Sequence, residues 1–96
     1  MITFSNKTSN GNFDYTNDEL GLVIVGSYAL NENIDLIRID FSFGSSRDSM
    51  NSYLSGNAPD GTNMQFNINC NDFILLTKMM SVYDSIVAAI KANYTD

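Results

Sequence analysis

Alternation of apolar and polar residues dominates the first seventy positions and predicts a series of β-strands. The clearest case is Ile34–Phe43, where every second side chain is apolar and is expected to face a core. The inward positions are Ile37, Ile39, Phe41 and Phe43, and the outward ones are Arg38, Asp40 and Ser42. The preceding run, Leu20–Leu30, is apolar on both faces, which favours a central strand. The polar segment Asn31–Asn33 between them predicts a β-hairpin.

Two shorter strands are predicted before this hairpin. Ile2–Ser5 forms the first, and Phe13 and Tyr15 continue as a short return strand. The pair Asn10 and Gly11 lies between them and favours a turn, because both residues tolerate a positive φ.

A further strand is predicted at Met64–Cys70, where the alternation returns. Its apolar side carries Met64, Phe66, Ile68 and Cys70, and its other side carries an amide row of Gln65, Asn67 and Asn69. We expect Cys70 to act as a small buried hydrophobe.

The stretch Gly44–Gly61 is less regular. Ser46 is a suitable cap for a short helical turn that carries Met50, Tyr53 and Leu54, so we expect a helical turn within a crossover connection.

From Phe73 the apolar spacing changes to a helical period, which predicts a helix to about Asn93 that begins after Asn71 or Asp72. Apolar residues cover about half of its circumference, more than a surface helix needs to cover a sheet. We expect one part of this arc to pack in the core, namely Leu76, Met79, Tyr83 and Ile90. The remaining flank, Leu75, Val82 and Ile86, is predicted to form a homodimer interface. The alternative is that the Met50–Leu54 segment covers this flank.

Together these elements predict one α+β domain over residues 1–96. Its architecture is a mainly antiparallel sheet of four or five strands with one long C-terminal helix packed on one face, a two-layer sandwich.

Charge narrows the class of partner. Eleven acidic residues against five basic ones give a net charge of −6, which opposes direct binding to nucleic acid and favours a basic protein surface. We expect Asp14, Asp18 and Glu19 to lead such contacts. Further candidates are Asp40, Asp48 and Asp60. The alternative is that the acidic charge serves solubility alone.

Candidate chemistry is sparse. The chain has no histidine, the usual general base near neutral pH, and no cofactor motif, so we expect no enzymatic activity, no cofactor and no metal site. One cysteine cannot form an intramolecular disulfide, and no basic leader with an apolar run opens the chain, so we expect a cytoplasmic protein. No unbroken apolar run approaches the roughly 18 residues of a membrane span, so no membrane partner is expected.

These features favour a small, acidic, non-enzymatic protein-binding module. By analogy, a stoichiometric inhibitor of a basic, nucleic-acid-handling protein would have this composition, as phage or mobile-element antagonists of restriction or CRISPR systems do. Two alternatives stay open: a self-assembling structural subunit, and a small-ligand binder that uses the amide row.

Overall fold

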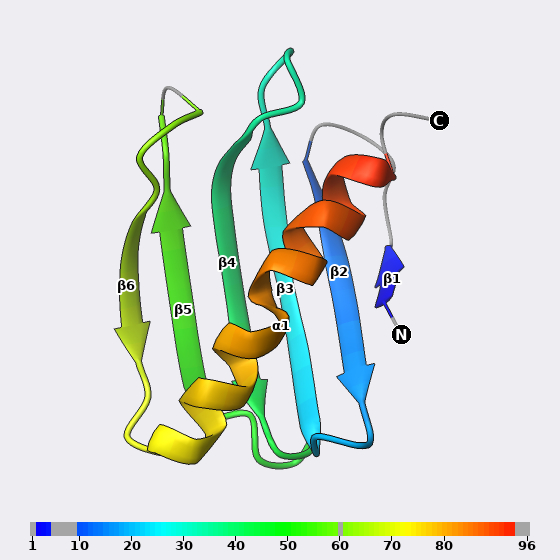
Figure 1. Ribbon diagram of the computed structural model, residues 1–96, viewed down its shortest axis with the longest axis vertical. Helices are drawn as coiled ribbons and strands as arrows, with labels where there is room; N and C mark the ends of the chain where they lie inside the picture. Colours follow the sequence, from blue (N-terminus) through cyan, green and yellow to red (C-terminus); the bar gives the residue numbers. More distant parts are fainter. Residues whose placement is uncertain (1, 5–9, 60, 94–96) are drawn as a thin grey trace.

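The computed structural model describes residues 2–4, 10–59 and 61–93. They form one six-stranded antiparallel sheet and one helix, and the order of the strands in the sheet follows their order in the chain (Figure 1). The elements are β1 (Ile2–Phe4), β2 (Asn10–Asn17), β3 (Leu22–Leu30), β4 (Leu36–Gly44), β5 (Ser52–Asn57), β6 (Gln65–Asn69) and α1 (Phe73–Ala92).

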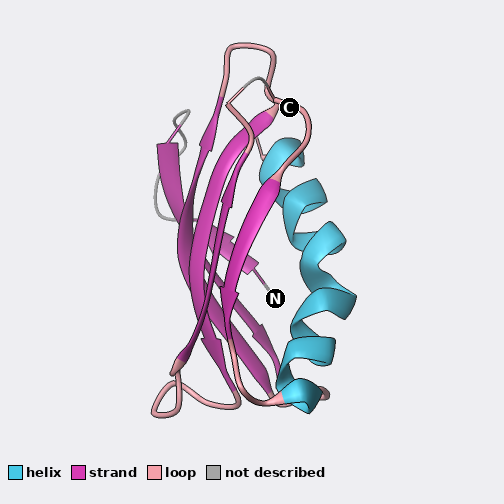
Figure 2. Ribbon diagram, turned by 90° about the vertical axis from the view of Figure 1, so that its left-hand side faces the viewer, coloured by secondary structure: helices cyan, strands magenta, loops and turns pink. Residues whose placement is uncertain are grey.

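The molecule has two layers, because α1 lies along one face of the sheet and leaves the other face open (Figure 2). This arrangement confirms the predicted α+β fold, although the sheet has six strands where four or five were expected.

The β3–β4 hairpin forms as predicted. Its register pairs Gly26 with Phe41 and Tyr28 with Ile39, so the apolar sides of both strands face the helix. The Asn31 side chain organises the connection, because its Oδ1 accepts hydrogen bonds from the backbone N–H groups of Asn33 (2.9 Å) and Asp35 (3.0 Å).

The predicted turn at Asn10 and Gly11 is wrong. Both residues belong to β2, where they pair with Ala29 and Tyr28, and the β1–β2 connection lies outside the described residues.

The predicted helical turn around Met50–Leu54 is also wrong, because Ser52–Asn57 forms strand β5. The strand alternates as β-strands do, but its buried positions are Ser52, Leu54 and Gly56, of which only Leu54 is large and apolar. Gly56 leaves little space for a side chain, because a Cβ would lie 3.0 Å from Met64 Sδ and 3.1 Å from the ring of Phe66. Small residues at buried positions therefore concealed the strand.

The core lies between α1 and the middle of the sheet. Phe13, Tyr28, Phe41 and Phe43 are all buried, and neighbouring rings make tilted or edge-to-face contacts at centroid distances of 5.8 to 6.4 Å.

Helix α1 begins at the predicted place, since the carboxylate of Asp72 caps it by accepting a hydrogen bond from the Leu75 N–H (3.1 Å). Its buried stripe consists of Leu75, Met79, Val82, Ile86 and Ile90.

The predicted homodimer interface on Leu75, Val82 and Ile86 is therefore wrong, since these residues face the domain's own sheet. The helix is rotated relative to the expectation, so Leu76 and Tyr83 lie at the margin of the core.

By length and composition α1 could also span a membrane. Here it packs on the sheet instead, and the residues of its sheet-facing stripe are buried within the domain. The helix contains no long unbroken apolar run, because Thr77, Lys78, Ser81 and Asp84 interrupt it.

Candidate functional site

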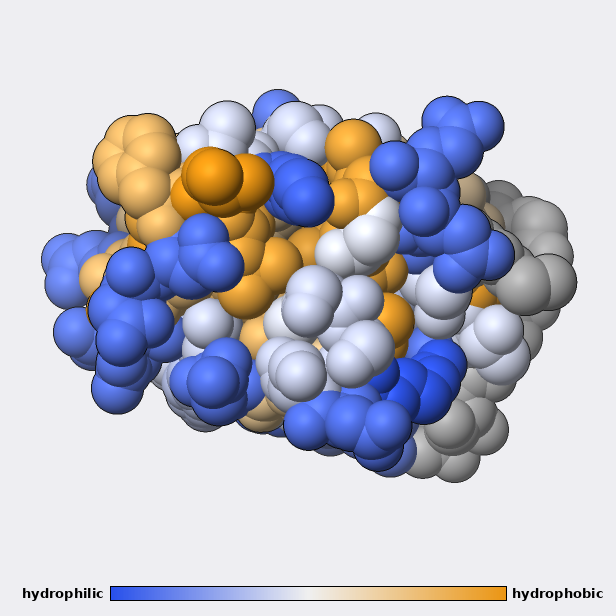
Figure 3. Space-filling view, turned by 90° about the horizontal axis from the view of Figure 1, so that it is seen from below, coloured by the Kyte–Doolittle hydropathy of each residue, from blue (hydrophilic) through white to orange (hydrophobic). Residues whose placement is uncertain are grey.

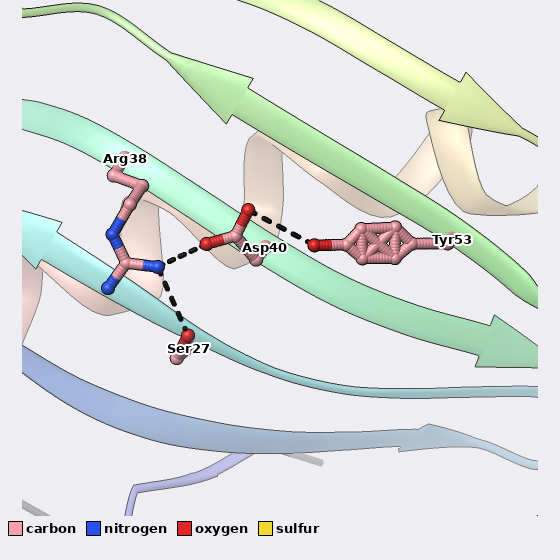
Figure 4. A network of polar contacts seen from close by, with 4 residues as sticks. All are labelled: Ser27, Arg38, Asp40 and Tyr53. Carbon is pink, nitrogen blue, oxygen red and sulfur yellow. Dashed lines mark hydrogen bonds and ion pairs between the residues drawn. The ribbon is translucent and has the colours of Figure 1, made fainter.

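The open face of the sheet is polar and holds a network across its central strands. Arg38 donates hydrogen bonds to the Asp40 carboxylate and to Ser27 Oγ (3.4 Å), and the Tyr53 hydroxyl donates to Asp40 Oδ1 (3.4 Å). Figure 4 shows the four side chains bridging β3, β4 and β5. The carboxylate of Asp40 is therefore paired with Arg38 within the protein.

Asp14, also on the open face, is held in the same way. Both carboxylate oxygens accept hydrogen bonds from Arg47, at 2.7 and 3.0 Å. These hydrogen bonds, and the charge of Asp14, raise the pKa of the Arg47 guanidinium. Two of the predicted partner-binding acids, Asp14 and Asp40, are thus already paired with arginines, and Asp60 lies outside the described residues.

The amide row predicted on β6 lies on this open face, as expected from the alternation. Asn67 pairs with Ser55, and Asn69 pairs with Tyr53, which places the row beside other polar side chains. A hollow of about 350 Å³ lies between Tyr53 and Asn69. Since it opens widely on a flat sheet, it offers a small molecule little enclosure, and the surface suits a macromolecule better.

The remaining predicted acids gather at one end of the sheet. Asp18 and Glu19 lie in the β2–β3 turn and Asp48 in the β4–β5 loop, and all three are exposed. In an antiparallel meander these two connections share an end, which is the lower end in Figure 1. The Asp72 cap at the start of α1 lies at this end too. We call it the acidic end.

Two large apolar side chains are exposed at the same end, directly after Asp72 in the chain. Phe73 and Ile74, in the first turn of α1, are 81% and 70% exposed. Figure 3 looks at the acidic end and shows apolar side chains exposed next to hydrophilic ones. Neither residue was predicted to belong to a site. The sequence did indicate that Ile74 would be exposed, however, because this residue lies outside the apolar half of the helix.

A second apolar surface lies between α1 and β6. The helix crosses the sheet diagonally, so Phe66 and Ile68 face the helix side but remain 46% and 43% exposed. Together with Met80 and Tyr83 they line a groove of about 310 Å³, in which Phe66 contacts the Tyr83 ring edge to face at 5.5 Å. We call this the β6 groove.

Burial against this groove raises the pKa of Tyr83 to about 12, with a smaller contribution from the charge of Asp84. An unfolded tyrosine ionises near pH 10, so the free energy of unfolding is expected to fall as the pH rises from about 10 to about 12. Tyr83→Phe should flatten this fall, and Tyr53→Phe, which removes an exposed phenol, should retain it. Denaturant titrations across this pH range measure both variants; an equal fall in Tyr83→Phe would contradict the assignment.

Cys70 is partly buried, less than predicted, at the end of β6. Its Sγ accepts a hydrogen bond from Ser52 Oγ (3.3 Å) and donates one to the Asp72 carbonyl (3.3 Å). Across residues 2–4, 10–59 and 61–93, no three carboxylate or thiol side chains form a group that could hold a metal ion.

No protein family, curated protein or solved structure matches the chain.

Proposed function

We propose that the protein is a non-enzymatic protein-binding module that docks a basic partner on its acidic end. The observation that carries this proposal is the exposure of Phe73 and Ile74 at the end of the sheet where Asp18, Glu19 and Asp48 form no ion pair with a described arginine or lysine. Interface hot spots typically combine a central aromatic or aliphatic anchor with a polar rim. The acidic end has this composition.

The charge distribution supports a basic partner. Arg38 and Arg47 form ion pairs with Asp40 and Asp14. Among the described residues Asp18, Glu19 and Asp48 form no ion pair, and the same holds for Glu32, Asp35 and Asp84 away from the acidic end. Opposite charge on a partner would accelerate association, and the two apolar side chains would lose their contact with water on docking. Inhibition of a nucleic-acid-handling protein is the finer form of this proposal, because carboxylates can occupy positions where phosphates would bind.

The test begins with capture of partners from the native host and continues with association kinetics of the purified partner at several salt concentrations. Neutralising the pair Asp18→Asn and Glu19→Gln should slow association and flatten its dependence on salt. The matched control is Glu32→Gln with Asp84→Asn, an equal change of charge at exposed positions away from the acidic end.

A second variant tests the apolar contact. Phe73→Ser with Ile74→Ser should chiefly raise the dissociation rate, because anchors hold a complex after encounter. Unchanged rates in both double variants would refute docking at the acidic end, even if a partner is captured.

A further inference from the structure

We infer that the open face of the sheet binds a neutral polysaccharide chain that lies across the strands. This surface is separate from the acidic end, and the inference does not depend on the proposed function. The register of the sheet aligns one polar side chain from each of the strands β2 to β6 in a line across this face. We call this line the cross-strand row, and its members are Asn12, Ser27, Asp40, Ser55 and Asn67. Neighbouring strands lie about 4.8 Å apart, so the row is about 19 Å long.

A hollow opens toward each end of the cross-strand row. The first has a volume of about 300 Å³ and lies over β2, β3 and β4, and the second has a volume of about 350 Å³ and lies over β5 and β6. Their lining side chains include Asn12, Ser27 and Arg38 in the first and Tyr53, Ser55 and Asn67 in the second. A small molecule would fill only one hollow. An extended chain can occupy both, which favours a polymer.

The charges on this face cancel. Within the strands that the structure describes, the charged residues are Asp14, Arg38 and Asp40. Arg38 pairs with Asp40, and Arg47 reaches Asp14 from the β4–β5 loop. The open face is therefore close to neutral in a chain whose net charge is −6. A polyanion would be repelled by the chain as a whole, and a basic partner would be drawn to the acids outside this face, so the occupant is uncharged.

The polar groups of the cross-strand row select an occupant that carries hydroxyl groups. Amide and hydroxyl side chains both donate and accept hydrogen bonds, and the hydroxyl groups of a sugar do the same along the whole length of a polysaccharide. The carboxylate of Asp40 is held in the middle of the row by Arg38 and by the Tyr53 hydroxyl (Figure 4). It adds a charged acceptor, to which a hydroxyl donates a stronger hydrogen bond than to a neutral group.

Tyr53 provides the apolar contact. Its side chain is 42% exposed, and the hydrogen bond from its hydroxyl to Asp40 (3.4 Å) keeps the ring beside the row. The face of an aromatic ring carries partial negative charge, which attracts the polarised C–H groups of a sugar ring. Val25 is the other large apolar side chain exposed on this face among the described residues. Two such side chains are too few for the apolar centre of a protein interface, which favours a sugar over a protein.

Titration calorimetry of the full chain with neutral hexasaccharides is the first measurement. The probes are cellohexaose, mannohexaose, xylohexaose and maltohexaose, and the acidic comparison is an oligogalacturonate of the same length. We expect at least one neutral probe to bind with an affinity that does not change with salt, and the acidic probe not to bind. The disaccharide of the same sugar should bind at least about tenfold more weakly, because it cannot reach both hollows.

Two pairs of variants test the residues. Tyr53→Ala should weaken binding by about tenfold, whereas Tyr53→Phe keeps the ring and should retain most of the affinity. Asn67→Ala should also weaken binding, and Asn33→Ala is its matched control, because it makes the same change at an exposed position of the β3–β4 turn. Circular dichroism verifies that all the variants fold.

NMR spectra of the backbone amides locate the bound chain. The amides of Ser27, Asp40 and Ser55 should shift on titration, and the variant Asp18→Asn with Glu19→Gln should bind as the wild type does, since the acidic end takes no part. Absence of binding by every neutral hexasaccharide at millimolar concentration overturns the inference. So does binding that Tyr53→Ala leaves unchanged, or a set of shifts confined to α1 or the acidic end.

Discussion

Replacing Ile86 with glutamate is expected to unfold the protein at 25 °C. Ile86 is 1% exposed and lies in the centre of the helix stripe that faces the sheet, between Met79 and Ile90. Truncating such a side chain to alanine costs about 2 to 5 kcal/mol. A buried carboxylate adds a desolvation penalty of several kcal/mol, and the total approaches the 5 to 15 kcal/mol that stabilises a typical domain.

Ala88→Glu is the matched control, because it introduces the same charge at an exposed position two residues along the same helix. Far-ultraviolet circular dichroism and the dispersion of an NMR spectrum distinguish the two variants. If Ile86→Glu were a folded monomer and the wild type a dimer, Ile86 would belong to an interface and the packing of α1 would have to be revised.

Gly26→Ala is expected to produce the second largest loss of stability, about 3 kcal/mol. Gly26 lies in the middle of β3 and pairs with Phe13 on one side and Phe41 on the other. A Cβ at this position would lie 2.0 Å from the backbone oxygen of Asp40 and 2.4 Å from the Cβ of Phe41. Neither obstacle can move by a change of rotamer, so β3 and β4 would have to separate locally.

Gly21→Ala separates this steric effect from the general effect of losing a glycine. Gly21 has a φ of 66° and open space around the position of a Cβ, so its substitution introduces only backbone strain of about 1 to 2 kcal/mol. Denaturant unfolding of both variants gives the comparison. A Gly26→Ala protein as stable as the wild type would contradict the close approach of the two strands.

The sequence predicted those elements whose side chains carry a clear period. Ile39, Phe41 and Phe43 alternate with polar residues, and in the structure all three lie on strand β4 of the β3–β4 hairpin and are buried in the hydrophobic core. Strand β5 escaped prediction because Ser52 and Gly56 occupy buried positions without an apolar signal. The period of apolar residues predicts a strand only where large apolar side chains occupy the buried positions. It gives no prediction where small residues fill them.

The orientation of α1 escaped prediction for a different reason. An apolar arc of half a circumference is compatible with several rotations of the helix, and the shape of the sheet selects one of them. The large apolar side chains of α1 that remain exposed are Phe73, Ile74 and Met80, and none of them belongs to the predicted flank of Leu75, Val82 and Ile86.

The roles of the acidic residues could be predicted only in part. Asp14 and its partner Arg47 are 33 residues apart and meet only through the fold, so local sequence gives no sign of their pairing. The gathering of Asp18, Glu19 and Asp48 at one end likewise depends on the strand order.

That strand order also bears on how the chain folds during synthesis. Each strand pairs with the strand before it in the chain, so β2, β3 and β4 can pair one after another as they leave the ribosome. This pairing needs no contact with distant segments of the chain. The helix follows all six strands in the chain. The aromatic face of the newly formed sheet is therefore exposed to solvent until α1 has been synthesised and covers it. During this interval a chaperone that recognises apolar strands could bind that face.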